Sequence, residues 1–298
     1  MGFWRAWPAA RGPFLVLTPA VVALGASTAH GSVYAWAGSE LLLVLVAALA
    51  AHISVNAFNE AADFRNGLDH LTTRTPFSGG SGLLPTHPER LPDVQRLAWG
   101  SLLLLLVVGA VLILQRGWPL AVLGGLGVGL VLAYSRFLVR SPWGSLLAPG
   151  LAFGPVMVLG THVALGAPLD ARAWCASMVP FFGVNNLLLL NQLPDMAADQ
   201  QVGRRNWPLA YGTRAAVAAY GVMLLAMWGC LAVGWVMGWF PVHTLVVGLM
   251  LWPAARVWRR LRALRQGQSP DSTVLALNVW LAVGTPSLLA LACGLGLG

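Results

Sequence analysis

The sequence consists largely of apolar runs of about 20 residues separated by short polar segments. A helix of that length spans the hydrocarbon core of a bilayer, and backbone polar groups within lipid must pair internally. Each run is therefore predicted to form a transmembrane helix. Only 9% of the 298 residues are charged, which is far below the share in ordinary soluble domains. A water-soluble globule is excluded, because too little polar surface is available to cover it.

Nine membrane spans are predicted. The first begins after two arginines and resembles a signal peptide in outline, but the next apolar run follows almost at once, so we interpret it as a span. The chain is thus predicted to be all-α and polytopic, with one transmembrane domain over residues 1–298. The predicted spans are 13–29, 41–59, 95–114, 118–138, 145–165, 173–192, 213–235, 242–258 and 273–296.

The distribution of arginine predicts how the chain is oriented. All 18 basic residues are arginines, and 16 of them fall in segments that face the cytoplasm if the N-terminus does; Arg116 and Arg172 are the exceptions. Cytoplasmic loops carry such an excess of basic residues. We therefore expect a protein of the cytoplasmic (inner) membrane, with its N-terminus inside and its C-terminus outside. The same distribution argues against nucleic-acid binding, despite a net charge of +8.

Carboxylates are scarce and clustered. Of ten in the chain, five lie in two stretches at the ends of the second and sixth predicted spans. Residues four apart share a helix face, and both of these spans end on the predicted cytoplasmic side, so the two stretches are expected to face each other. The first motif comprises Asn59, Glu60, Asp63 and Asp69, and the second motif comprises Asn191, Asp195 and Asp199.

Two facing carboxylate clusters favour a hard divalent cation. Magnesium takes oxygen ligands and often completes its shell with substrate phosphates, and ionisable groups at membrane helix ends often mark function. Guanidinium groups match phosphate oxygens, and arginines follow both motifs. These are Arg65, Arg74, Arg204 and Arg205.

Two glycine-rich stretches are also noted. The segment from Thr75 to Gly82 follows the first motif, and its glycines permit close backbone approach to an anion, so it is either a lid or a flexible turn. Gly125 and Gly129, four residues apart in an apolar span, are predicted to permit close helix packing.

The paired motifs, on the second and sixth of nine helices, resemble the UbiA superfamily of intramembrane prenyltransferases. Within it, the stretch from Asn59 to Asp69 is similar to the Asn-Asp-x-x-Asp-x-x-x-Gly-x-Asp pattern of the 1,4-dihydroxy-2-naphthoate prenyltransferases of menaquinone synthesis, with Glu60 in the second position. Asp63 and Asp69 are six residues apart, whereas the 4-hydroxybenzoate, haem and chlorophyll branches tend to place these aspartates four apart. The stretch from Asn191 to Arg205 resembles the second motif of the same naphthoate branch.

The resemblance implies a helical bundle around a central cavity, with Mg²⁺ as cofactor and with Asp63 and Asp195 as catalytic residues. Ionisation of an allylic polyprenyl diphosphate would give a carbocation, which an aromatic acceptor such as 1,4-dihydroxy-2-naphthoate attacks. The implied metal ligands are Asn59, Asp63, Asp69, Asn191, Asp195 and Asp199. The residues implied near the diphosphate are Asn59, Asp69, Arg65, Arg74, Asn191, Arg204, Arg205 and Tyr134.

Other functions stay open at this point. Acceptors like 4-hydroxybenzoate or homogentisate are alternatives, and so is a secondary transporter, although transporters usually bind near the bilayer midplane and these acids lie at helix ends. A membrane CDP-alcohol phosphotransferase is disfavoured because its Asp-x-x-Asp-Gly-x-x-Ala-Arg opening is absent. The expected partners are a polyprenyl diphosphate, an aromatic small molecule and the lipid bilayer, with no nucleic acid and no particular oligomeric state.

Overall fold

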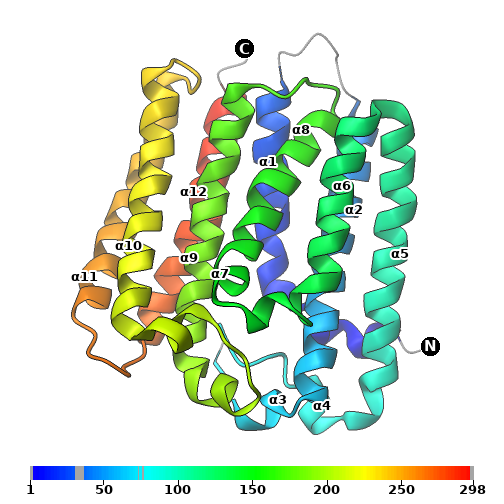
Figure 1. The fold of residues 1–298 in the computed structure, drawn as a ribbon. Coiled ribbons are helices and arrows are strands. Elements are labelled where there is room, and N and C mark those ends of the chain that lie inside the picture. The colour runs from blue at the N-terminus through cyan, green and yellow to red at the C-terminus, as the bar shows by residue number, and fades with distance from the viewer. Residues whose placement is uncertain (1–2, 31–36, 73, 76, 296–298) are drawn as a thin grey trace.

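A computed structural model describes residues 3–30, 37–72, 74–75 and 77–295 of the chain. Every regular element in these ranges is a helix, and the long helices run side by side in one bundle (Figure 1). Seven of them are long and apolar enough to cross a membrane, so the prediction of an all-α, multi-pass membrane protein is confirmed. These seven candidate spans are Gly12–Ala29, Gly38–Arg65, Pro88–Arg116, Pro142–Ala164, Ala171–Gln201, Trp207–Val236 and Ser272–Gly294.

Two of the nine predicted spans are not among these seven. The prediction at 118–138 corresponds to α6, Trp118–Tyr134, which is apolar but has only 17 residues. The prediction at 242–258 corresponds to η6, Val242–Met250, which continues into α11, Leu251–Arg262. The last turn of α11 carries three arginines, which reduce its apolar length. The ninth predicted span matches α12, Ser272–Leu295, and its last residue, 296, lies outside the described residues.

The helices that carry the two motifs extend beyond the predicted spans. Helix α2 runs Gly38–Arg65 and helix α9 runs Ala171–Gln201, whereas the predictions ended at residues 59 and 192. Asn59 and Asp63 therefore lie in the last turns of α2, and the whole second motif lies in the last turns of α9. The remaining long helices are α1 (Leu17–Ala29), α5 (Leu91–Arg116) and α10 (Trp207–Val236).

The predicted span at 145–165 is one continuous but irregular helix. It comprises α7 (Pro142–Leu151), the wider π-type segment Ala152–Leu159 and α8 (Gly160–Ala164). Pro149 and Pro155 lie inside it, and proline removes a backbone donor and disturbs the helical ladder. The backbone N–H of Gly150 donates to Oδ1 of Asn185 on α9, at 2.6 Å, which ties the irregular helix to its neighbour.

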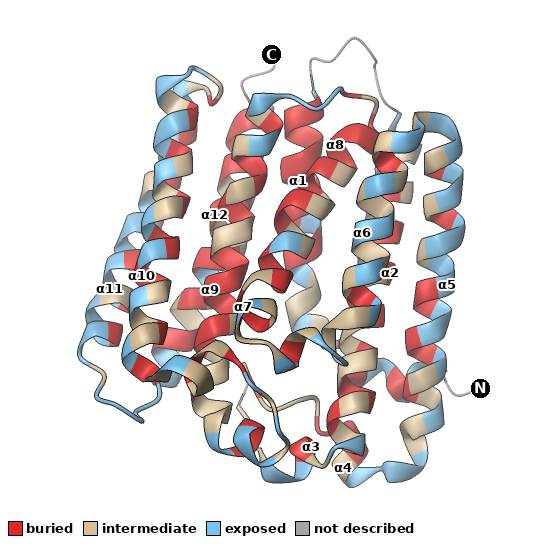
Figure 2. Cartoon of the chain, viewed as in Figure 1, coloured by how far each residue is buried: buried red, intermediate tan, exposed pale blue. Residues whose placement is uncertain are grey.

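Burial separates inner from outer helices (Figure 2). The largest buried cluster joins α1, α9, α10 and α12, and Tyr220 and Met227 are among its largest fully buried side chains. By contrast, α5 exposes a row of large apolar side chains, and Leu114 is 87% exposed. Exposed apolar residues on a membrane protein contact lipid tails, so α5 lies at the edge of the bundle.

Close packing in the bundle depends on a glycine other than those predicted. A Cβ built on Gly25 of α1 would lie 2.6 Å from Cβ of Thr161 and 2.6 Å from the carbonyl oxygen of Val158. Gly25 therefore allows α1 to pack directly on the irregular helix. A Cβ built on Gly125 or Gly129 would have no atom of a neighbouring element within 4 Å. The prediction that these two glycines permit close packing is therefore wrong.

Candidate active site

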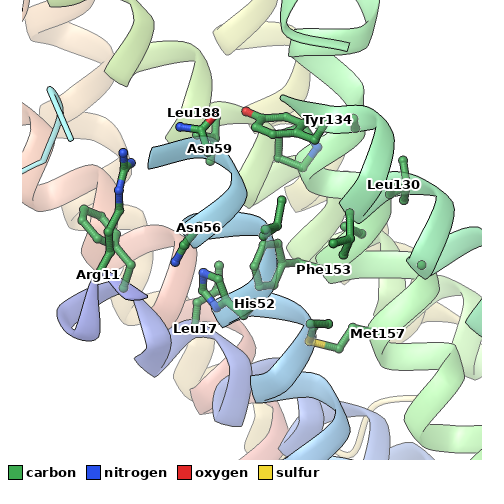
Figure 3. Close-up of a pocket in the computed structure, with 18 of the residues that line it drawn as sticks. Arg11, Leu17, His52, Asn56, Asn59, Leu130, Tyr134, Phe153, Met157 and Leu188 are labelled. Carbon is green, nitrogen blue, oxygen red and sulfur yellow. The ribbon is translucent and has the colours of Figure 1, made fainter. Parts of the chain in front are cut away.

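The main cavity, of about 350 Å³, lies among α2, α6, the irregular helix and α9. Its walls are mostly apolar, and its polar lining comes largely from the two motifs and from Arg11, which precedes α1. Figure 3 shows Arg11 on one side of this cavity and Tyr134 on the other, with His52, Asn56 and Asn59 along α2 between them. A long apolar space with one acidic end can hold an amphiphile whose head group binds metal.

Two elements supply the side chains of the first motif. Nδ2 of Asn59 donates to Oδ2 of Asp63, at 2.8 Å, one helical turn apart on α2. The chain then turns at Gly67, whose φ of +83° suits glycine, and begins the short helix α3, Leu68–Leu71. Asp69 on α3 is buried, and burial raises its pKa to about 7, with Glu60 and Asp63 adding to the effect.

The second motif lines the same cavity from α9. Asn191, Asp195 and Asp199 lie one turn apart along one face of that helix, and all three line the cavity. Asp199 is buried and accepts from Nδ2 of Asn206 at 2.7 Å. Carboxylates separated by more than 120 residues in the sequence thus meet at one end of the bundle, as the repeated spacing predicted.

Arg204 joins the two motifs directly. Its guanidinium forms an ion pair with Asp63 and a second one, at 3.2 Å, with Asp199. Burial alone would lower the pKa of Arg204, but these two carboxylates raise it above its usual value. Arg204 therefore stays charged and offsets part of the negative charge of the cavity.

Several oxygens in the cavity have no hydrogen-bond partner among the described residues. All four are buried, and all belong to carboxylate or amide groups at the acidic end. They are Oδ2 of Asp69, Oδ1 of Asp195, Oδ1 of Asn191 and Oε1 of Gln192. Buried polar atoms normally find partners, so these oxygens are suited to bind a cation or a hydrogen-bond donor.

No three His, Cys, Asp or Glu side chains in the described part of the chain converge tightly enough to bind a metal by themselves. That finding suits magnesium, which usually uses one or two protein carboxylates and takes its other ligands from water and phosphate. The donor set here is oxygen throughout, with neither thiol nor imidazole at the acidic end.

The glycine-rich loop packs over the first motif. Gly80 has a φ of +73°, and a Cβ there would lie 2.8 Å from Oδ1 of Asp69, so glycine permits the approach. Glu60 is fully buried beneath the loop, where its carboxylate accepts from the hydroxyl of Ser81 and, at 3.0 Å, from the N–H of Ser81. The loop is thereby fastened to α2 at the edge of the cavity.

Three of the predicted arginines do not line the cavity. Arg65 and Arg205 are exposed and are not among the residues that line it. Arg74 is also exposed, and its guanidinium packs over Gly82, in the space that a Cβ of that residue would take. Among the arginines predicted near the diphosphate, only Arg204 lines the cavity. Tyr134, which the resemblance implies near the diphosphate, lines the cavity.

Some lining residues were missed from the sequence. Asn56 precedes Asn59 by three residues and shares its helix face, so the helical period was a usable signal. Gln192 and Asn206 are amides beside the second motif and were detectable as polar residues in apolar surroundings. No feature of the sequence marked Arg11 as a cavity residue, since it lies outside both motifs. It reaches the cavity because the N-terminal segment folds against α2.

Comparison with known proteins agrees with this arrangement. The model of the UbiA prenyltransferase family matches residues 16–282. The 1,4-dihydroxy-2-naphthoate octaprenyltransferase of Bacillus subtilis (strain 168) is 26% identical over 220 residues, covering 73% of this chain and 64% of that protein. The apo UbiA homologue from Aeropyrum pernix K1 has a TM-score of 0.74 at 17% identity, covering 95% of this chain and 98% of that one.

A further solved structure, a UbiA homologue from Archaeoglobus fulgidus bound to GPP and Mg²⁺, has a TM-score of 0.72 at 14% identity. It covers 98% of this chain and 99% of that one, so the fold is shared over nearly the whole length. These matches confirm the resemblance drawn from the paired motifs. Since the family model spans most of its sequence, the chain belongs to the UbiA prenyltransferase family.

Proposed function

We propose that this protein transfers a polyprenyl group from an allylic polyprenyl diphosphate to 1,4-dihydroxy-2-naphthoate. The observation that carries the proposal is the meeting of two acidic motifs at one end of a mostly apolar cavity. The acidic end suits the diphosphate and the apolar walls suit the prenyl chain. The name of the Bacillus subtilis relative supports this acceptor.

Mg²⁺ fits the residues present. The acidic end offers only oxygen ligands, and four of its buried oxygens lack partners within the described chain. Asp63 and Asp195 would hold the cation, helped by Asn59, Asp69, Asn191 and Asp199. When bound, Mg²⁺ would offset the charge that develops on the diphosphate as the carbon–oxygen bond breaks. The Archaeoglobus fulgidus homologue bound to GPP and Mg²⁺ supports this assignment.

The protein's own groups complete the reaction. Arg204, which is held between Asp63 and Asp199, offers a guanidinium to the phosphate oxygens. The apolar walls exclude water, so the allylic carbocation is attacked by the acceptor ring rather than by water. In the naphthoate reaction the ring then releases carbon dioxide.

We also propose that α6 and the continuous helix formed by η6 and α11 cross the bilayer, which gives nine spans around a central cavity in one domain over residues 1–298. Support comes from the arginine distribution, which is regular only with nine crossings. The same rule places the N-terminus and the acidic end of the cavity on the cytoplasmic side.

The test is incubation of detergent-purified protein with Mg²⁺, a polyprenyl diphosphate and a panel of aromatic acids, followed by mass spectrometry. We expect a prenylated naphthoquinol that has lost carbon dioxide, and no product when excess chelator replaces Mg²⁺. If only 4-hydroxybenzoate or homogentisate were prenylated, the proposed acceptor would be wrong but the proposed prenyl transfer would still hold. If no acceptor were prenylated and no diphosphate released, the transporter alternative would take precedence.

A further inference from the structure

A second pocket, also of about 350 Å³, adjoins the main cavity; we call it the side pocket. It lies between the N-terminal segment, which includes η1 (Phe3–Ala10), and the glycine-rich loop. Three aromatic side chains form its walls, namely Trp7, Phe14 and Phe77. Aromatic walls of this kind bind a planar ring through stacked or edge-to-face contacts.

The side pocket adjoins the acidic end of the main cavity. The two share Arg11, Phe14, Phe77, Ser78 and Gly80 among their lining residues. A molecule in the side pocket would therefore lie next to a diphosphate held by the two motifs. This is the place that a second substrate has to occupy if it is to attack the carbon that loses the diphosphate.

Arg11 supplies a cation at the shared wall. It has a φ of 54° and a ψ of 56°, and it is the only non-glycine residue with positive φ in the described part of the chain. Its Nε is buried without a partner there, and its nearest carboxylate contact is Oε2 of Glu60, at 3.5 Å. Ser81 already donates twice to Glu60, so the guanidinium of Arg11 keeps donors free for another anion.

The balance of charge favours the shared wall at Arg11 over the carboxylates of the acidic end as the site of an acidic acceptor. Carboxylates outnumber arginines at the acidic end, so an anionic substrate without a metal would be repelled there. We propose that the side pocket binds the ring of an aromatic carboxylate and that Arg11 donates to its carboxyl group. This inference rests on the proposed function and names where the acceptor binds.

The test measures each substrate separately in wild type and in Arg11→Asn. Asparagine adopts positive φ more readily than most residues, so this variant removes the guanidinium without straining the backbone. With farnesyl diphosphate and 1,4-dihydroxy-2-naphthoate as probes, the KM for the naphthoate should rise about tenfold or more, and that for the donor should change less than about twofold. Arg11→Lys should show an intermediate KM for the naphthoate.

Arg5→Gln is the matched control, since Arg5 is exposed on the same segment and lines neither pocket. The methyl ester of the naphthoate gives a second comparison: wild type should bind it more weakly than the acid, and Arg11→Asn should bind both alike. An unchanged KM for the acid, or a rise confined to the donor, would overturn the inference while leaving the prenyl transfer intact. Absence of turnover in wild type would instead count against the proposed function.

Discussion

Arg204 forms an ion pair with Asp63 across 141 residues of sequence, and this contact links the two acidic motifs. The same guanidinium also pairs with Asp199 on α9, at 3.2 Å. Both carboxylates are buried, and a buried charge is costly unless it is paired. Arg204 therefore serves as the counter-ion of the acidic end, and the proposed function gives it a second role in binding phosphate.

Replacing Arg204 with glutamine should lower both stability and activity. The change leaves Asp63 and Asp199 without their cation, and breaking a buried pair costs about 3 kcal/mol or more. We expect a lower melting temperature in detergent and little diphosphate release. Arg205→Gln is the control, because Arg205 is exposed and does not line the cavity. Equal behaviour of the two variants would contradict the role of Arg204.

Asp63→Asn and Asp195→Asn should each reduce turnover by about 100-fold or more, because each removes a negative charge that would hold the Mg²⁺ that stabilises the leaving diphosphate. Diphosphate release by variants matched for folding is the measurement. Asp170→Asn should be near normal. Asp170 accepts from the N–H of Ala173, at 2.6 Å, at the other end of α9, and asparagine caps a helix about as well. Near-normal release by either motif variant would refute its assignment.

Gly25→Ala and Gly129→Ala should shift stability in opposite directions. The added methyl at Gly25 meets Thr161 and Val158, so the variant should lose about 1–3 kcal/mol. Gly129 is exposed with open space around it, and alanine there should gain about 0.5 kcal/mol from helix propensity. Thermal unfolding of the two variants in the same detergent distinguishes these effects, and a loss at both positions would contradict the packing argument.

The orientation can be tested by labelling. Helix α3 and the end of α12 lie at opposite ends of the bundle (Figure 1). In a background without Cys175, Cys230 and Cys293, a cysteine near position 67 should react from the cytoplasmic side, and one added at the C-terminus should react from the outside. Labelling of both from one side would mean that the chain crosses the membrane an even number of times between them, which contradicts the proposed nine spans.

The motifs could be located from the sequence, because acids are rare in it and the helical period places Asn59 with Asp63 on one face. The ends of α2 and α9 could not, since hydropathy locates the apolar run and both helices continue beyond it into the polar motifs. The sequence pattern also does not predict which distant residues form ion pairs. Nothing in the sequence distinguishes Arg204, which turns inward, from Arg205, which turns outward, since only the turn after α9 decides between them.

The N-terminal segment shows the same limit. Arg11 was counted among the cytoplasmic arginines, and its place in the cavity follows from contacts of η1 with α2 and α5 that are made only after the bundle assembles. Residues outside a periodic element have their positions set by tertiary contacts, which a local pattern does not record.

Glu60 occupies the motif position where the Asn-Asp-x-x-Asp pattern has aspartate, yet both of its oxygens are engaged by Ser81 and Arg11, and Glu60 does not line the cavity. Its extra methylene lets it reach Ser81, 21 residues further along the chain. Closing that loop has an entropic cost, and the carboxylate holds it closed before any substrate arrives. Shortening Glu60 to aspartate would thus loosen the loop at the edge of the cavity and change the rates of substrate entry and product release. The residues proposed to bind the cation would stay the same.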